Sequence, residues 1–231
     1  PPSLPPPPSL PPPPPLPPLP PLSLGYVAAA SEDDLRSLIE DATSTAANVS
    51  IYLPPGAEFK LGSQISCSST IKVTVASSGE GATLDGQRET GLFYLEGGCS
   101  LTLRGLTLVN GRSSAAGAGG VVFAYGAGDV EIIESVVRDC SADHGGVVSA
   151  SSSGAVSITR STVSSCSAGY YGGVVYAEYS DAVSIIESNV TDCSAGNYGG
   201  VVSSYDSGAV SITRSTVSSC SADYFGGVVY A

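Results

Sequence analysis

The chain contains no methionine or tryptophan, one histidine, and nine lysine and arginine residues against 21 aspartate and glutamate residues. The formal charge of −12 disfavours double-stranded nucleic acid and anionic membranes as partners, because both are polyanions. No apolar run approaches the roughly 20 residues that a membrane-spanning helix needs, so we expect no membrane span.

Several features favour a secreted protein of the extracellular space or cell surface. The six cysteines are an even number, which is compatible with disulfides. Two sequons, at Asn48 and Asn189, permit covalent N-glycans in a secreted protein. The chain begins at Pro1 rather than at methionine, as expected if a signal peptide has been removed.

Composition divides the chain into a Pro-rich segment (1–24), a linker with a capping helix (25–50) and a repetitive body (51–231). Residues 1–22 contain fifteen prolines and no charge. Proline fixes φ and lacks an N–H donor, so the segment predicts a polyproline II rod on the order of 70 Å long.

Five leucines of the Pro-rich segment are separated by 6, 6, 3 and 3 residues. Because polyproline II has three residues per turn, they form one apolar stripe. The stripe comprises Leu4, Leu10, Leu16, Leu19 and Leu22. A plain solvated spacer needs no aligned stripe, so we expect the rod to dock on this body or on a neighbouring subunit.

The Pro-rich composition resembles the hydroxyproline-rich extracellular glycoproteins of plants and algae. The resemblance covers this segment only, and it implies hydroxyproline or O-glycans in the region of Ser3, Pro5, Pro6, Pro7, Pro8 and Ser9.

The stretch SEDDLRSLIEDAT (31–43) predicts a helix. Ser31 is a favourable N-cap, and Asp34 stands at the capping-box position. The apolar residues Leu35, Leu38, Ile39 and Ala42 follow the spacing of one helix face. We expect this face to cover the edge of a first strand, VSIYL (49–53).

The body repeats with a constant period. Five GGVV motifs begin at Gly119, Gly145, Gly172, Gly199 and Gly226, with spacings of 26, 27, 27 and 27. Short β-type runs fill each unit, which is typical of a solenoid. Val156 and Ile158 alternate with polar residues and should point inward, and Val163 starts the next side. The Gly-Gly pair predicts a sharp corner or close backbone packing rather than a phosphate loop, because no lysine follows it.

Stacking coils about 4.8 Å apart places equivalent residues in three columns. The aromatic column contains His144, Tyr171, Tyr198 and Phe225. The cysteine column contains Cys140, Cys166, Cys193 and Cys220. The charge column contains Glu134, Arg160, Glu187 and Arg214.

The alternating sign of the charge column explains a longer repeat. STVSSCSAGYYGGVVYA (161–177) recurs almost unchanged at 215–231, which is 54 residues later. Identical neighbouring coils would stack like charges, which destabilises a sheet. Alternating coils avoid that repulsion and favour one register.

The residues 48–111, with ATLDG followed by LTLRGLTLVNG, resemble right-handed parallel β-helix proteins of the pectin-lyase-like superfamily. The GGVV units are similar to the GGAI repeats of polymorphic outer-membrane and adhesin-like β-helices. The resemblance covers residues 31–231. It implies an all-β, right-handed, single-stranded parallel β-helix with about 27 residues per coil and an N-terminal capping helix. A scaffold of this kind serves enzymes, adhesins and filaments, so fold alone does not name the function.

The sequence does not indicate an enzyme or a cofactor. Pectin-cleaving relatives need acids converging on one coil face, and the nearest approach is Asp85 with Arg88 in LDGQRE, which more plainly predicts a corner. His144 occupies an aromatic-column position rather than that of a general base. Other aspartates are scattered over the unit, at Asp139, Asp143, Asp192, Asp206 and Asp223. The calcium-binding Gly-Gly-x-Gly-x-Asp nonapeptide is absent.

The cysteines permit more than one state. Cys67 and Cys99 fall in successive early coils, so a disulfide between them is expected. Adjacent coils also bring column cysteines within disulfide range, so Cys140–Cys166 and Cys193–Cys220 are candidates, with a buried ladder of free thiols as the alternative. Zinc is disfavoured, because a straight column cannot converge tetrahedrally on one ion.

These features favour a non-catalytic subunit of an extracellular filament, mastigoneme-like surface appendage or coat, with copies of itself or other filament subunits as partners. The final coil ends at Ala231 without a capping element, so we expect the protein to continue, the ordered part to end there, or another subunit to stack on it. The alternatives are an adhesin or carbohydrate-binding β-helix that uses exposed tyrosine and serine faces, and an unusual polysaccharide lyase or hydrolase.

Overall fold

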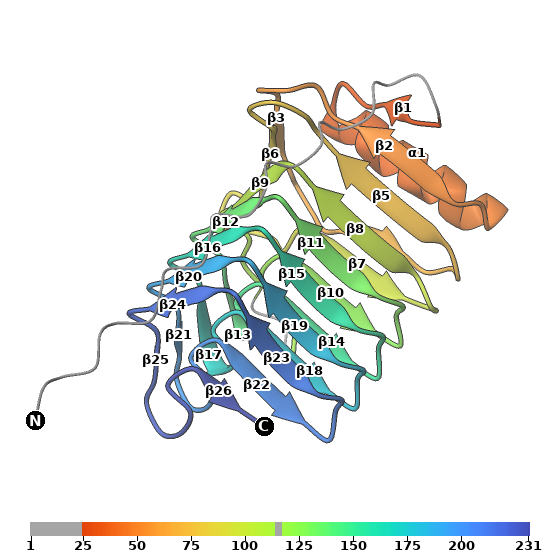
Figure 1. Ribbon diagram of the computed structural model, residues 1–231. Helices are drawn as coiled ribbons and strands as arrows, with labels where there is room; N and C mark the ends of the chain where they lie inside the picture. The colour runs from red at the N-terminus through yellow and green to blue at the C-terminus, as the bar shows by residue number, and fades with distance from the viewer. Residues whose placement is uncertain (1–24, 114–116) are drawn as a thin grey trace, which may run out of the picture.

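A computed structural model describes residues 25–113 and 117–231, which form a parallel β-solenoid of about seven coils (Figure 1). Val156 pairs with Val183, and Val183 pairs with Val210, so each of these coils takes 27 residues. The all-β solenoid predicted from the GGVV spacing is therefore confirmed. The Pro-rich segment with its leucine stripe lies outside the described residues.

The strands stack into four parallel sheets, which the chain visits in the order A, B, D, C within each repetitive coil. Sheet A contains β1 (Val27–Ala28), β2 (Val49–Tyr52), β5 (Lys72–Ala76), β8 (Ser100–Arg104), β11 (Val130–Ile133), β15 (Val156–Thr159), β19 (Val183–Ile186) and β23 (Val210–Thr213). Sheet B contains β3 (Glu58–Lys60), β6 (Ala82–Asp85), β9 (Leu106–Val109), β12 (Val136–Arg138), β16 (Thr162–Ser164), β20 (Asn189–Thr191) and β24 (Thr216–Ser218).

The other two sheets follow the cysteine and GGVV positions. Sheet D contains β13 (Ser141–His144), β17 (Ser167–Tyr171), β21 (Ser194–Ala195) and β25 (Ser221–Ala222). Sheet C contains β4 (Ile65–Cys67), β7 (Phe93–Glu96), β10 (Val122–Tyr125), β14 (Val148–Ser151), β18 (Val175–Glu178), β22 (Val202–Tyr205) and β26 (Val229–Tyr230). The repeat pattern predicted the strands of sheets A and B in these coils, whereas sheets C and D emerge only from the structure.

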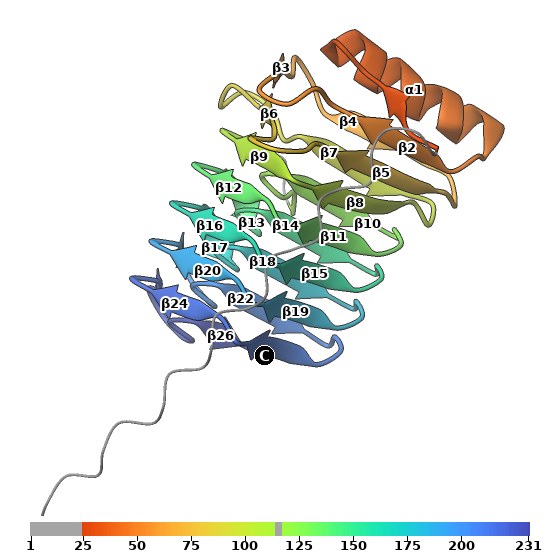
Figure 2. The same cartoon turned by 45° about the horizontal axis from the view of Figure 1, so that its top comes forward.

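The helix α1 (Glu32–Thr45) has the predicted capping box. The Ser31 hydroxyl accepts from the Asp34 N–H, and the Asp34 carboxylate accepts from the Ser31 N–H, both at 3.1 Å. Leu35, Ile39 and Ala42 are buried and join the main core. Figure 2 shows α1 lying across the end of the coil stack.

The expected position of the helix was wrong in one respect. The edge of β2 is covered by a strand, since β1 pairs with it at Val27↔Ile51 and extends sheet A into the segment predicted as linker. The helix instead packs against β2 and β4 over the end of the core. A strand can satisfy the N–H and C=O groups of a sheet edge, whereas an amphipathic helix is suited to burying apolar side chains.

The core is continuous along the solenoid. Val156, Ile158 and Val163 are at most 1% exposed, as the alternation predicted. Larger side chains such as Phe93, Leu95 and Leu101 fill the early coils, and valine dominates the later ones. Each fully buried side chain of this kind contributes about 1.5–3 kcal/mol relative to exposure, so the repeating inward positions supply most of the cohesion.

From β11 onward, three corners of each coil are made by non-glycine residues in the left-handed backbone region, with φ between 45° and 58°. The corner between sheets A and B uses Glu134, Arg160, Glu187 and Arg214. The corner between sheets B and D uses Asp139, Ser165, Asp192 and Ser219. The corner between sheets C and A uses Ser152, Tyr179 and Asp206. The predicted charge column is therefore also a column of corner residues.

Two serine columns satisfy the backbone just after these corners. Ser135 N–H donates to the Ser161 hydroxyl one coil away at 3.1 Å, and Ser161 N–H donates likewise to Ser188 at 3.1 Å. A second column repeats the pattern, with Ser153 N–H donating to the Ser180 hydroxyl at 3.1 Å. An unpaired buried N–H is costly, so serine at these positions keeps the corner hydrogen-bonded without a strand.

The fourth corner, between sheets D and C, is the predicted Gly-Gly corner. Gly172 has φ of 66°, and a Cβ atom there would collide with the carbonyl oxygen of Val175. A Cβ atom on Gly173 would collide with the carbonyl oxygen of Gly200 in the next coil. The motif therefore provides both the left-handed turn and the close approach of neighbouring coils.

The expected disulfide between Cys67 and Cys99 is confirmed. The two Cα atoms are 6.1 Å apart, and the bond joins β4 to the turn that precedes β8. It links neighbouring early coils close to the end covered by α1.

We expect Gly172→Ala to lower the free energy of unfolding by at least about 2 kcal/mol, because left-handed backbone costs a non-glycine residue about 1–2 kcal/mol and the collision adds to it. Gly126→Ala is the matched control, since Gly126 has φ of 56° and no neighbouring atom within 4 Å of an added Cβ. Denaturant unfolding of both variants checks this. Equal losses would show that the collision contributes nothing.

Candidate functional site

The aromatic column lies at the Gly-Gly corner, where His144, Tyr171, Tyr198 and Phe225 pair from coil to coil. The ring centroids of His144 and Tyr171 are 4.9 Å apart. Those of Tyr171 and Tyr198 are 5.5 Å apart with planes only 7° from parallel, and Phe225 continues the stack at 5.7 Å from Tyr198. Stacked rings of this kind contribute beyond the area that they bury.

A second ring-bearing column runs along the outer face of sheet C. Its members in register are Tyr94, Phe123, Ser149, Tyr176, Ser203 and Tyr230. From Ser149 onward, serine and tyrosine alternate from one coil to the next. Tyr176 stacks on Tyr171 at 5.5 Å, and Tyr230 stacks on Tyr198 at 4.7 Å, so this column interlocks with the aromatic column.

The alternation creates a groove over Ser203, where a small residue lies between the rings of Tyr176 and Tyr230. The groove has a volume of about 380 Å³. Its lining consists of Tyr171, Tyr176, Glu178, Tyr198, Ser203, Tyr205 and Tyr230. We call this the tyrosine groove, and it is the strongest candidate site in the part of the chain that the structure describes.

The outer margin of the tyrosine groove is strongly exposed. Tyr205 is 56% exposed, and its ring meets that of Tyr179 edge-on at 5.7 Å. Ser203 is only 3% exposed and lines the bottom of the groove. The groove therefore combines flat aromatic walls, phenol hydroxyls and a serine floor, which suits a ligand that stacks on rings and accepts hydrogen bonds.

The electrostatics keep the groove neutral apart from one carboxylate. Burial, followed by the charge of Glu178, raises the pKa of Tyr176 to about 12, so its phenol remains a donor at neutral pH. Burial lowers the pKa of His144 despite the opposing charges of Asp143 and Glu178. The His144 ring lies 4.9 Å from each of the Tyr171 and Tyr176 rings, with its plane tilted by 37° and 54°, so it is a member of the ring cluster.

The charge column is assembled at one corner, as expected, but as separate clusters. Glu134 accepts from Arg160 at 3.0 Å and from Arg104, which the sequence pattern did not single out, at 3.3 Å. Glu187 accepts from Arg214 at 2.7 Å. In the described part of the chain, no ion pair joins Arg160 to Glu187, so Arg160 and Arg214 each turn towards the glutamate of the preceding coil.

The cysteine column consists of free thiols, which decides between the two alternatives that the sequence left open. Cys140, Cys166 and Cys193 are buried, and Cys220 is partly exposed. Each Sγ lies 3.3 Å from the carbonyl oxygen two residues earlier in the chain. Hydrogen bonding within the column and burial raise the pKa of Cys166 and Cys193.

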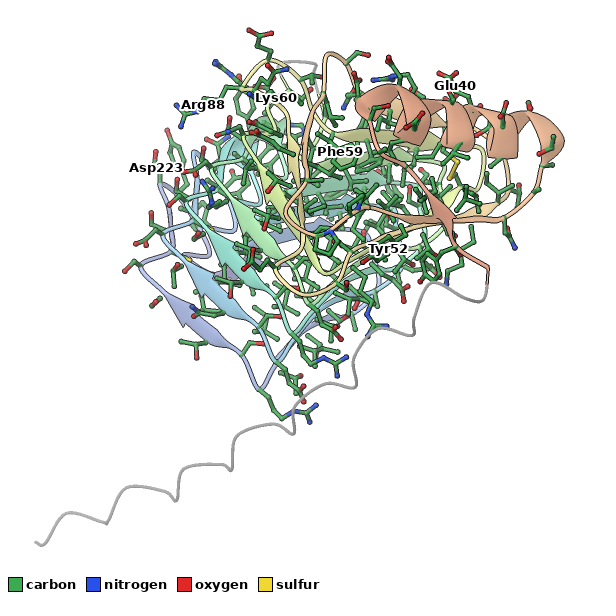
Figure 3. All side chains as sticks on the ribbon, turned by 90° about the horizontal axis from the view of Figure 1, so that it is seen from above. Glu40, Tyr52, Phe59, Lys60, Arg88 and Asp223 are labelled. Atoms are coloured by element: carbon green, nitrogen blue, oxygen red, sulfur yellow. A yellow bond between two sulfur atoms is a disulfide. The ribbon has the colours of Figure 1, made fainter. Side chains whose placement is uncertain are left out.

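The LDGQRE stretch forms a corner, and its charged residues do not converge. The Asp85 carboxylate accepts from the Gln87 N–H at 2.8 Å and from the Asn110 side chain at 2.9 Å. Arg88 lies at the edge of the body (Figure 3), and its Nε donates to the Asn110 side-chain oxygen at 3.5 Å, so it meets Asp85 only through Asn110. Asp139, Asp192 and Asp206 occupy corners on two sides of the coil. Within residues 25–113 and 117–231, no three histidine, cysteine or acidic side chains are grouped to hold a metal ion.

Both sequons lie on the surface. Asn189 is exposed at the start of β20, and Asn48 is exposed just before β2. The hydrogen bond of Asn48 to the Lys72 N–H, at 2.7 Å, uses its oxygen rather than the nitrogen that carries an N-glycan. The Pro-rich glycosylation region, Ser3 to Ser9, lies outside the described residues.

No known protein-family profile, curated protein or solved structure matches the chain. No helix in the two described ranges has the length and apolar character needed to cross a membrane. The assignment of the fold therefore rests on the register of the strands.

Sequence reasoning missed the tyrosine groove, although its signal is present. The two residues after each GGVV read SA, YA, SS and YA in the last four units, which is the serine–tyrosine alternation on sheet C. Without knowing that these residues form a strand, we could not predict that Tyr176 and Tyr230 flank a hollow. The serine corner columns were missed for the same reason.

We expect Glu134→Gln to lower the free energy of unfolding by about 1 kcal/mol and Glu187→Gln by about half as much, because Glu134 faces two arginines and exposed pairs are weak. Both residues have similar left-handed φ values, 53° and 51°, so backbone strain cancels in the comparison. Denaturant unfolding at low and high salt measures this. A larger loss of stability for Glu187→Gln than for Glu134→Gln, or losses that do not depend on salt, would contradict the ion pairs described above.

The thiol column predicts a loss of stability at alkaline pH. The folded state keeps Cys166 and Cys193 protonated, so their contribution is complete below the unfolded pKa of about 9 and falls as the unfolded thiols ionise. The expected loss is about 1.4 kcal/mol per pH unit for each thiol. Between pH 8 and pH 10, the free energy of unfolding should fall less steeply with pH for Cys166→Ala than for the unchanged protein. Denaturant unfolding at each pH measures this, and identical slopes would refute the thiol origin of the loss.

Proposed function

We propose that the protein is a non-catalytic structural subunit of an extracellular filament, surface appendage or coat. The observation that carries the proposal is the unbroken coil geometry: the later coils repeat the same four corners in register, without an inserted loop. Because successive coils have the same shape, the solenoid is a regular rod whose outer faces repeat from coil to coil. Such a wall offers periodic surfaces for contacts between subunits.

The placement of charge supports the same proposal. Glu134 and Glu187 are neutralised by arginines at a corner, and Asp85 is engaged in its own turn. These acids serve register and turn formation instead of gathering on one coil face, as a polysaccharide-cleaving site of the pectin-lyase-like kind would require. The parallel β-solenoid is consistent with the β-helix resemblance of residues 31–231, and we propose the right-handed sense that this resemblance implies.

An extracellular setting is supported by the Cys67–Cys99 disulfide, because such bonds persist in oxidising compartments. The exposed sequons at Asn48 and Asn189 fit the same setting. Copies of the chain are the proposed partners, and glycans at the sequons are the proposed modification.

One observation favours a second candidate function, a carbohydrate-binding adhesin. The tyrosine groove presents exposed rings, and flat aromatic faces are suited to stacking on sugar rings. A glycan array probed with monomeric protein would favour this candidate if it showed saturable binding.

Assembly is tested with the purified full-length chain by sedimentation velocity and negative-stain microscopy. We expect the average particle mass to rise with concentration and elongated assemblies to form, because subunit contacts obey mass action. Isolated monomers at high concentration would contradict a filament subunit. Release of unsaturated uronic acids from pectin or alginate would instead support a lyase.

A further inference from the structure

The tyrosine groove has a repeat that matches one particular ligand geometry. Tyr176 and Tyr230 are equivalent positions two coils apart, separated by Ser203. With strands spaced by about 4.8 Å, two coils advance about 9.6 Å along the solenoid axis. A polyproline II helix advances about 9.3 Å in one turn of three residues. A polyproline rod laid along the axis would therefore meet an equivalent ring once per turn.

The chemistry of the groove also suits a proline-rich ligand. Proline has no N–H, so a polyproline segment presents only carbonyl acceptors and apolar ring faces. The groove supplies phenol hydroxyls as donors, and the Tyr176 phenol stays protonated at neutral pH. Aromatic-lined grooves are a recurring means of binding polyproline helices, because the rod is ordered before it binds.

The chain itself contains such a ligand. Leu16, Leu19 and Leu22 follow one another at intervals of three residues, so their side chains repeat once per polyproline II turn. One leucine can enter the hollow over Ser203 while the adjacent prolines lie on the rings of Tyr176 and Tyr230. The segment is uncharged, so neither Glu178 nor the formal charge of −12 opposes its approach.

We propose that the tyrosine groove is the docking site for the leucine-striped Pro-rich segment, residues 1–22. Docking orders the segment along the solenoid axis, with its leucine stripe towards sheet C and its opposite face towards solvent. The segment comes from a neighbouring copy and joins subunits. The groove begins about five strand spacings, roughly 24 Å, from β1, whereas Leu22 lies five residues before Val27 and reaches at most roughly 18 Å, so the stripe of the same copy cannot lie along it. The joining role rests on the proposed structural function.

Photo-crosslinking in the full-length chain tests the docking. A benzophenone amino acid replaces Tyr205, which borders the groove and is 56% exposed. The control replaces Val136, which is 41% exposed on the outer face of sheet B. We expect the probe at position 205 to cross-link to residues 1–22 with about tenfold higher yield than the probe at position 136. Equal yields, or cross-links that avoid residues 1–22, would overturn the proposal.

Matched variants locate the contact. Tyr176→Ser introduces the residue that neighbouring coils carry at this register, Ser149 and Ser203, so the strand is expected to remain intact. It removes one wall of the groove and should lower the cross-link yield at least about tenfold. Tyr176→Phe keeps the ring and should retain most of the yield. Circular dichroism checks that both variants keep the fold. Equal cross-link yields for Tyr176→Ser and Tyr176→Phe would count against ring stacking.

Replacing Leu16, Leu19 and Leu22 together with serine tests the segment without touching the body. The yield from position 205 should fall about tenfold if the stripe enters the groove, since three apolar side chains are lost. An unchanged yield would show that the stripe faces elsewhere and would overturn the orientation. Protection of position 205 by neutral oligosaccharides, with no cross-link to residues 1–22, would make the groove a sugar site and refute the proposal.

Mixing ordinary and ¹⁵N-labelled chains before irradiation separates the docking proposal from the proposed function. Cross-links between copies yield peptide pairs that combine both isotopes along with same-label pairs, whereas cross-links within one chain never combine both isotopes. Assembly in sedimentation without cross-links to residues 1–22 would refute docking and leave the structural function standing. Cross-links to residues 1–22 that never combine both isotopes, obtained from a monomeric sample, would overturn docking from a neighbouring copy.

Discussion

The register between parallel strands of successive coils is the constraint on which the rest of this structure depends. Once Val156, Val183 and Val210 are stacked in sheet A, all the remaining residues of a coil lie beside their equivalents in the next coil. Any side chain must then tolerate a near-copy of itself about 4.8 Å away. Rings, thiols, hydroxyls and small apolar groups tolerate this, whereas identical charges do not. The composition of each column follows from that requirement.

The corners show how the chain turns without long loops. Glu134 and Arg160 adopt left-handed backbone although neither is glycine, and the buried serine one residue further on accepts a hydrogen bond from the preceding coil. The corner between sheets D and C carries a Gly-Gly pair in each GGVV unit, and Gly173 shows why, because it lies against the backbone of the next coil. Short corners keep the outer faces continuous. The tyrosine groove is therefore a feature of the wall itself, formed by side-chain alternation rather than by an inserted loop.

The alternation of coils has two physical consequences on different faces. At the corner between sheets A and B it separates like charges, and Arg160 and Arg214 each turn to a glutamate of the preceding coil. On sheet C the same two-coil period alternates Ser203 with Tyr176 and Tyr230, which opens the groove. One repeat unit of two coils thus provides both register and a periodic surface. A polyproline rod shares that period because its turn is nearly as long as two strand spacings.

The sequence by itself determined the solenoid, its period of 27 residues, the capping box of α1 and the membership of the three columns, because each depends on local pattern or on equal spacing. Tertiary structure decided the position of β1, the free state of the thiol column and the pairing of Glu134 with Arg104. It also decided that Tyr176 and Tyr230 flank Ser203 on an outer face. Spacing shows which residues share a column, but the corners decide how neighbouring columns face one another.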